Sequence, residues 1–419
     1  MREIASPKLI FLLLMLPLQA ADWAQWRGPQ ANGISAEALP ANPDFENILW
    51  RQSAGIGFSS LAVADGRVYT MGHSGGKRDG LETLWCWDAA TGAELWSDTY
   101  QAPLIDHFYE GGPGATPTVR GGTVYTYSKH GQLHAYEAAT GKLLWKRDMV
   151  AEAGLSRPPE WGFACSPCFA GENLLLIEAG ATFGLDPVTG AVLWKGESFT
   201  PAYGTPKVFI QGGRKLAAVM KTEGLLVLDT VDGTTVAFAA WKTPFDTSAT
   251  TPIVVAGAGN KASRIFISTG YDRGCALFEL DADSGELNKI YEKPVMSNHM
   301  NNSVLIEGNL YGFDGTAHRG RPTEFVCMEL ATGKELYRLP PGEGLGCGSV
   351  MATGGGKTLL ILTERGELVA APATPEGFVE SARAQVLGGR CWSVPVLANG
   401  RIYGRNAKGD VFCLGVARD

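Results

Sequence analysis

The chain has 419 residues, of which 45% are hydrophobic and only 19% are charged, and it contains 54 glycines and 23 prolines. This composition excludes an intrinsically disordered chain and is typical of a turn-rich globular β protein. The net charge is -7 and no basic stripe runs along the chain, so nucleic acid is not expected as a partner. No polybasic segment suited to docking on a membrane is present either.

The first 21 residues have the pattern of a secretory signal peptide. Arg2 and Lys8 precede the apolar run LIFLLLMLPL, and small residues suited to cleavage follow it up to Ala21. The run is too short to span a bilayer. We therefore expect a periplasmic or secreted protein, in which an extension at 22–45 precedes a single domain at 46–419.

A nine-residue pattern then recurs along the chain. DAATGAELW at 88–96 returns as EAATGKLLW at 137–145 and as DPVTGAVLW at 186–194, and its turn glycines continue with a period in the upper forties. Each period holds four short alternating or β-branched runs, separated by turn signals such as GG, HG and TG. No segment shows a sustained helical period, so few helices are expected. The turn glycines are Gly92, Gly141, Gly190, Gly233, Gly285, Gly333 and Gly377.

A repeat of about 40–50 residues with four strands is the unit of a β-propeller, in which each sheet buries its faces against its neighbours. We predict an all-β, eight-bladed propeller of four-stranded antiparallel blades. Seven blades is the alternative, because the repeat at 340–387 is the most degenerate. The chain ends without a last fourth strand, so the strand around Trp50 should complete the last blade and close the ring. The fourth-strand aromatic residues, which should pack between blades, are Trp96, Trp145, Trp194, Trp241, Tyr291 and Tyr337.

In a propeller, the segments that lead into the innermost strands meet at one mouth of the axial channel, and loops on a rigid scaffold often carry binding residues. These lead-in segments are rich in glycine and small residues, which crowding at the axis already explains. Packing does not require the large polar and aromatic residues among them. We interpret these as candidates for contacting a ligand, and the alternative is that they only line a wet channel. They are Trp161, Tyr203, Asn298, His299, Asn301, Asn302, Arg390 and Trp392.

Two connections between second and third strands, at 72–84 and 314–325, are also long. Their basic side chains could form a cationic lip suited to a small anionic ligand, although such side chains are commonly only solvated. They are His73, Lys77, Arg78, His318, Arg319 and Arg321.

The six histidines form neither an HxH nor an HExxH spacing, so no metal site is indicated. Of the eight cysteines, Cys86, Cys327 and Cys413 share one position in the third strand, where small buried thiols are expected. Cys347 and Cys391 lead into adjacent blades near the mouth. We predict that they could pair as a disulfide in an oxidising compartment.

Blades of the form GxVYxxxxxGxLxAxDxxTGxxLW resemble the pyrroloquinoline-quinone-type (PQQ-like) propeller repeat over roughly residues 22–419. Secreted bacterial members of that family resemble the chain further, in WAQWRGPQANGIS near the mature N-terminus and in CWSVPVLANGRIYGRN near the C-terminus. The family includes quinoprotein alcohol dehydrogenases and the BamB-like subunit of the outer-membrane β-barrel assembly machinery.

The resemblance leaves three functions open. The first is a binding module, expected to be a monomer, that takes a small anionic ligand or a protein partner at the propeller mouth. The second is an oxidoreductase of alcohols or sugars using PQQ with Ca²⁺, in which Trp161 or Trp392 would stack on the cofactor and arginines would pair with its carboxylates. The third is an envelope assembly factor of the BamB type. The chain has no Cys-Cys pair like that of the quinoprotein enzymes and no recognisable catalytic motif, so the binding module is the leading hypothesis.

Overall fold

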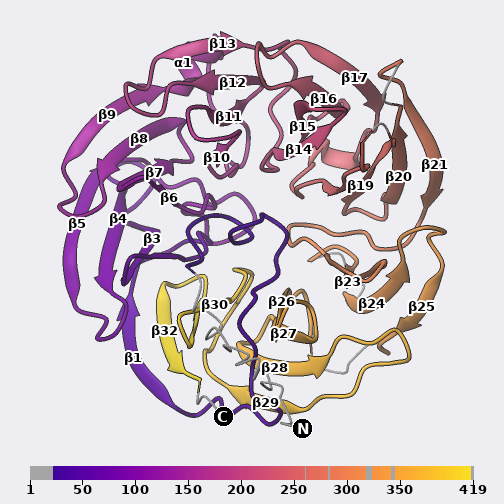
Figure 1. Cartoon of the computed structure of the whole chain (residues 1–419). Helices are drawn as coiled ribbons and strands as arrows, with labels where there is room; N and C mark the ends of the chain where they lie inside the picture. The colour runs from indigo at the N-terminus through magenta and orange to yellow at the C-terminus, as the bar shows by residue number, and fades with distance from the viewer. Residues whose placement is uncertain (1–21, 260, 282–283, 318–322, 341–344, 417–419) are drawn as a thin grey trace, which may run out of the picture.

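The computed structural model describes residues 22–259, 261–281, 284–317, 323–340 and 345–416, and the predicted signal peptide lies outside these ranges. Eight four-stranded antiparallel sheets surround a central axis (Figure 1). The predicted eight-bladed propeller is confirmed, and the degenerate repeat forms a complete blade. The core consists of clusters between adjacent sheets, such as the one that joins Leu133 of one blade to Ile177 and Phe183 of the next.

Blades 1 to 7 run outward from the axis in chain order, so the first strand of each is innermost. Blades 1 and 2 contain β2 (Ala62–Ala64), β3 (Arg67–Ser74), β4 (Leu81–Asp88), β5 (Glu94–Gln101), β6 (Thr118–Arg120), β7 (Thr123–Tyr127), β8 (Gln132–Glu137) and β9 (Leu143–Asp148). Blades 3 and 4 contain β10 (Cys168–Phe169), β11 (Leu175–Ala179), β12 (Ala181–Leu185), β13 (Val192–Lys195), β14 (Lys207–Gln211), β15 (Arg214–Met220), β16 (Gly224–Asp229) and β17 (Thr235–Ala240).

Blades 5 and 6 contain β18 (Ile253–Val255), β19 (Ser263–Thr269), β20 (Gly274–Leu280), β21 (Leu287–Lys293), β22 (Val304–Ile306), β23 (Asn309–Asp314), β24 (Glu324–Glu329) and β25 (Glu335–Arg338). Blade 7 contains β26 (Ser349–Thr353), β27 (Thr358–Leu362), β28 (Glu367–Pro372) and β29 (Ala382–Gln385). Blade 8 contains β30 (Val396–Ala398), β31 (Arg401–Arg405), β32 (Asp410–Gly415) and β1 (Ile48–Ser53).

The ring closes as predicted, because β1 is the outermost strand of blade 8 and pairs antiparallel with β32, with Trp50 opposite Cys413. Helical structure within the described residues is limited to α1 (Met149–Ala153) and the 3-10 turn η1 (Pro244–Asp246). No helix in this part of the chain has the length and apolar character needed to cross a bilayer.

The recurring TG and LW elements of the sequence build the joints between blades. Trp96, in the fourth strand of blade 1, packs on Gly141 in the last turn of blade 2 and donates its Nε1–H to the Ala138 carbonyl at 3.0 Å. A Cβ atom on Gly141 would lie only 2.6 Å from the indole ring, and its φ of +75° also favours glycine. The same joint forms between Trp145, Gly190 and the Pro187 carbonyl, and between Trp50, Gly92 and the Ala89 carbonyl.

The third-strand residue opposite each of these tryptophans is small. Trp96 lies opposite Cys86 and Trp145 lies opposite Ala135. Gly184 lies opposite Trp194, and a Cβ atom there would be 2.2 Å from the indole ring. The predicted buried thiols therefore occupy a position that the neighbouring aromatic ring keeps small.

Trp241 does not belong to this series, so its predicted place in the fourth strand is wrong. β17 ends at Ala240, and Ala237 takes the equivalent position, opposite Val227. Trp241 follows the strand and donates its Nε1–H to Thr269 Oγ1 at 2.9 Å. Blade 4 thus lacks the aromatic joint, and Gly285 in the last turn of blade 5 faces Val236 instead.

A buried guanidinium holds blade 8 to blade 1. Arg405 of β31 is 0% exposed and donates to the carbonyls of Gly55 at 2.8 Å and Met71 at 2.5 Å, and to Thr70 Oγ1 at 3.2 Å. Burial lowers its pKa to about 9. Within the described ranges its partners are neutral oxygens. The Arg405 side chain therefore connects the last blade to the first where the ring closes.

The segment 22–38, which we call the plug, crosses the channel instead of forming a blade strand (Figure 1). Trp23 pairs with Val63 of β2, and Ile34 pairs with Ala352 of β26. Glu37 accepts hydrogen bonds from the backbone N–H groups of Asn399 and Gly400 at 2.6 and 2.7 Å. These contacts place the plug against the innermost strands and the turns that follow them.

Two further side chains anchor the plug, the buried Arg27 and the half-buried Trp26. Arg27 donates to the Ser303 carbonyl at 2.9 Å, and burial lowers its pKa to about 10. Trp26 donates its Nε1–H to Thr251 Oγ1 at 3.1 Å. Both partners lie beside innermost strands, so the plug closes the channel from one face.

Candidate functional site

Hydrogen bonds between lead-in segments link every neighbouring pair of blades around the axis. Most use a short polar side chain: the Ser166 N–H donates to Thr205 Oγ1 at 2.9 Å, and Asn302 Nδ2 donates to the Thr251 carbonyl at 2.6 Å. The remaining links are Phe58 N–H to Pro113 O, Thr116 N–H to Ser166 Oγ, Tyr203 N–H to Ser248 O, Asn301 Nδ2 to Gly348 O, Ser349 Oγ to Ser393 O and Ser393 Oγ to Phe58 O. This belt explains the small polar residues of the lead-in segments and fixes the positions of the larger ones.

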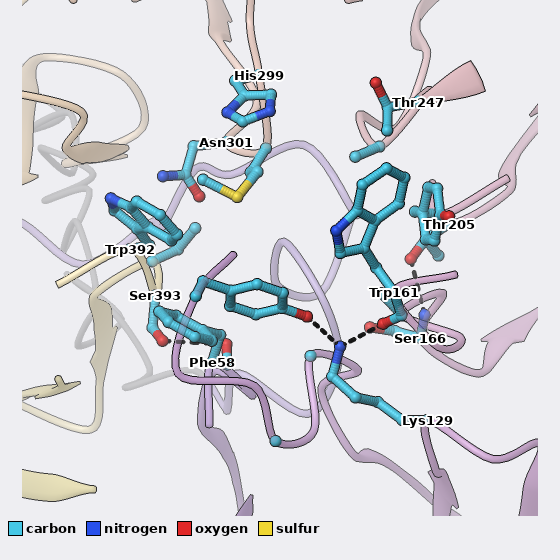
Figure 2. A pocket seen from close by; sticks show the side chains of 18 of the residues that line it. Phe58, Lys129, Trp161, Ser166, Thr205, Thr247, His299, Asn301, Trp392 and Ser393 are labelled. Carbon is cyan, nitrogen blue, oxygen red and sulfur yellow. Dashed lines mark hydrogen bonds between the residues drawn. The ribbon is translucent and has the colours of Figure 1, made fainter. Parts of the chain in front are cut away.

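A well of about 230 Å³ lies at the mouth, and seven of the eight lead-in segments contribute to it (Figure 2). Its walls are mainly aromatic. Phe58 stacks on Trp392 with ring centroids 5.4 Å apart, and Trp161 meets Tyr203 edge-on at 5.9 Å. The aromatic side chains that line the well are Trp26, Phe58, Phe108, Tyr109, Trp161, Tyr203, Tyr271 and Trp392. Since Trp26 belongs to the plug, the well is closed at its inner end.

Five of the side chains predicted from the lead-in segments line the well: Trp161, Tyr203, His299, Asn301 and Trp392. Asn298 and Asn302 do not, because their amides serve the scaffold. Asn298 is 1% exposed, donates to the Phe313 carbonyl at 2.8 Å and accepts from Ser303 Oγ at 2.9 Å. The spacing of polar residues in SNHMNNS did not distinguish ligand-facing amides from structural ones.

Arg390 lies behind the well and does not line it. Its guanidinium carbon is 4.4 Å from the centre of the Trp392 ring, and its Nη1 forms an ion pair with Glu110 at 2.6 Å. Its charge is therefore already balanced, and it orients the Trp392 ring.

The predicted placement of His73 on a loop at the mouth is wrong. β3 extends through Ser74 and pairs His73 with Glu82 of β4, so His73 is 2% exposed and bonds the Ala102 carbonyl through Nε2 at 2.8 Å. Burial lowers its pKa. Lys77 forms an ion pair with Asp106 at 2.9 Å, whereas His318, Arg319 and Arg321 lie outside the described residues.

The loop at 102–112, between β5 and β6, supplies lining residues that were not predicted: His107, Phe108 and Tyr109. Three polar contacts tie this loop to its surroundings. Two are ion pairs, Lys77 with Asp106 and Arg390 with Glu110, and in the third His107 Nε2 lies 3.1 Å from Glu160 Oε1. The loop was overlooked because most of it precedes the segment that leads into β6.

Lys129 contributes an ammonium group to the well, and the sequence did not predict this residue either. It lies between β7 and β8, is 4% exposed, and donates to the Trp161 carbonyl at 2.6 Å and to the Tyr109 hydroxyl (Figure 2). Among the described lining residues there is no Asp or Glu. Glu82 touches Lys129 only through the backbone N–H, at 3.4 Å, and burial raises the pKa of Glu82 to about 7.

Cys347 and Cys391 are both buried free thiols, so the disulfide suggested by their positions is not formed in this structure. Burial raises the pKa of each to about 12, which makes them poor nucleophiles. Nowhere in the described ranges do three or more His, Cys, Asp or Glu side chains gather as a metal would need.

The chain belongs to the PQQ-like β-propeller family, since the family model described as outer membrane protein assembly factor BamB matches residues 83–338. BamB from Moraxella catarrhalis is similar in structure, with a TM-score of 0.60 and 15% identity over 88% of this chain and 99% of that protein. Quinohemoprotein alcohol dehydrogenase from Comamonas testosteroni has a TM-score of 0.67 and 15% identity over 95% of this chain and 81% of the enzyme. No curated protein matches the sequence. At these identities the solved structures show the shared fold alone.

The well does not fit a carboxylate-bearing quinone held by Ca²⁺. Calcium takes about six to eight oxygen ligands, many of them carboxylates. The described lining residues include no carboxylate, and Glu110 is already paired with Arg390. Lys129 offers a single ammonium where several carboxylates would need partners. The residues present therefore do not support quinone-dependent chemistry in this well.

Proposed function

We propose that this protein is an extracytoplasmic binding module whose well takes a small ring-bearing ligand. The observation that supports this best is the aromatic lining, brought together from several blades and from the plug. Flat aromatic faces stack on ligand rings, and concave, mostly apolar pockets with a few polar groups are the usual form of small-molecule sites. The signal-peptide pattern and the family match support a location in the cell envelope or outside the cell.

The test uses tryptophan fluorescence and thermal unfolding of the mature protein with phenylacetamide, indole and glucose as separate ring probes. We expect at least one probe to raise the melting temperature and to change the fluorescence. Trp392→Ala should weaken binding about fivefold or more, since an aromatic pair contributes about 0.5–1.5 kcal/mol beyond burial. Trp145→Phe, which changes a joint between blades far from the lining, is the matched control. If none of the three probes binds the wild-type protein, the proposal fails.

The match to the BamB family model supports a second candidate, a scaffold role in envelope assembly. This role would use the outer surface of the propeller rather than the well. Loss of the gene should then lower the amounts of outer-membrane proteins, and the Trp392→Ala protein should restore them fully. Failure of Trp392→Ala to restore them would instead connect the phenotype to the well.

A further inference from the structure

We infer that the ligand of the well is a monocarboxylate with one aromatic ring, and that the Lys129 ammonium binds its carboxylate. The inference rests on the proposed function and adds the chemical class of the ligand. It departs from the sequence-based expectation, which placed the positive charge on the loops at 72–84 and 314–325.

The first argument is that the buried Lys129 ammonium donates only to neutral acceptors within the described residues. The side chain is 4% exposed, and a buried ammonium is costly unless an anion or good acceptors compensate it. Within the described residues both acceptors of Nζ, the Trp161 carbonyl and the Tyr109 hydroxyl, are uncharged. An ammonium carries three donors, so one remains for a ligand. Figure 2 shows Nζ at the wall of the well, beside Trp161.

The second argument is the absence of competing negative charge among the described lining residues. The carboxyl group of Glu82 accepts from the Lys129 backbone N–H and that of Glu364 accepts from Trp392 Nε1, but neither residue lines the well. Glu110 and Glu160 are engaged by Arg390 and His107. An anion entering the well therefore meets the Lys129 ammonium in mainly apolar surroundings, where its attraction is stronger than in water.

The third argument is the size and shape of the space. A dry cavity of about 150 Å³ is enough to hold benzene, so the well of about 230 Å³ accommodates one ring with a short substituent. The stacked pair Phe58 and Trp392 stands across the well from Trp161 (Figure 2). A ring between these faces could direct a one-carbon carboxylate arm toward Lys129.

The experiment compares phenylacetate with phenylacetamide, which has nearly the same shape without the charge, by isothermal titration calorimetry. A hydrogen bond to a charged group contributes about 1.5–3 kcal/mol, so we expect the acid to bind at least about tenfold more tightly. In Lys129→Met the ratio of the affinity for the acid to that for the amide should fall to about one. The affinity for the amide should stay unchanged, which would show that the well is intact. Lys129→Arg should restore part of the preference, and Lys142→Met, a control at an exposed lysine of blade 2 that does not line the well, should retain all of it.

The outcomes separate the two proposals. If neither compound binds the wild-type protein, the proposed function fails and this inference fails with it. If the amide binds as tightly as the acid, the binding function stands but the carboxylate inference is overturned, whatever the variants do. A preference for the acid that survives in Lys129→Met would also overturn it, because another group would then hold the charge.

Discussion

An alanine at Gly141 should destabilise the propeller by about 3 kcal/mol, whereas the same change at Gly122 should cost only about 1 kcal/mol. Both glycines lie in turns of blade 2 and have nearly the same backbone conformation, with φ of +75° and +74°. Alanine at positive φ costs about 1 kcal/mol, and this term is common to the two sites. They differ in space: a Cβ atom on Gly122 meets nothing within 4 Å, whereas one on Gly141 lies 2.6 Å from the Trp96 ring.

The difference between the two losses of stability measures how much the contact of Trp96 with Gly141 stabilises the joint between blades 1 and 2. To relieve the contact, the indole must shift, and the resulting overpacking typically costs about 1–3 kcal/mol. The shift also strains the bond from Trp96 Nε1 to the Ala138 carbonyl, which contributes about 1 kcal/mol. These terms add to the backbone cost and give the larger loss.

Urea unfolding monitored by circular dichroism measures both losses, provided that the transition is single and its m-value is unchanged. A double-mutant cycle with Trp96→Ala supplies the decisive comparison. Once the ring is absent, Gly141→Ala should cost about 1 kcal/mol, as Gly122→Ala does in the wild-type background. Two results would refute the view that the TG glycine and the LW tryptophan stabilise the contact between blades. One is an equal loss of unfolding free energy at the two glycines, and the other is a loss at Gly141 that Trp96→Ala does not reduce.

Two further predictions concern buried ionisable groups. Because burial raises the pKa of Glu82 from 4.5 to about 7, the folded chain keeps a proton that the unfolded chain has lost between these pH values, so stability should fall by about 3 kcal/mol as pH rises through that window. Urea unfolding at about pH 5 and about pH 8 should show this fall in the wild-type protein but not in Glu82→Gln, and an equal fall in both would contradict it. Arg405→Met should lower the free energy of unfolding by about 3 kcal/mol, since the buried Met71 carbonyl and the partly buried Gly55 carbonyl lose their donor. Arg401→Met, on the same strand but half-buried, should lower the free energy of unfolding by less than about 1 kcal/mol. Similar losses in the two variants would show that Arg405 does not stabilise the contact between blades 8 and 1.

The blade count was predictable because each repeated residue has a local physical role. Gly141 permits a turn and leaves room for Trp96, and the small Cys86 lies beneath the same ring. The turn glycine and the small third-strand residue must both fit the same ring, so they stay recognisable in repeats whose other residues differ. Trp241 was misplaced because it lies eight residues after Gly233, whereas Trp96 and its counterparts lie four residues after their turn glycines, the position that Ala237 takes in blade 4.

The candidate site was only partly predictable. Aromatic residues in lead-in segments, such as Trp161 and Trp392, could be assigned to the mouth because the fold fixes where those segments meet. Lys129 follows β7 in a turn that reads like any exposed hairpin, and it is buried because Tyr109 and Trp161 from other segments cover it. His73 was misplaced because β3 continues beyond the length that its turn signals suggested.

The plug determines what kind of site the propeller can offer. Residues 22–38 belong to no repeat, yet Trp26 lines the well and Arg27 reaches the backbone beside β22. An axial channel open at both ends would fill with water and weaken any charge interaction inside it. Because Trp26 of the plug lines the same well as Lys129, Phe58 and Trp392, the plug forms part of the wall that a ligand would contact. The repeat therefore supplies the scaffold, and the segment that does not repeat converts its channel into a well where one buried ammonium can select a ligand.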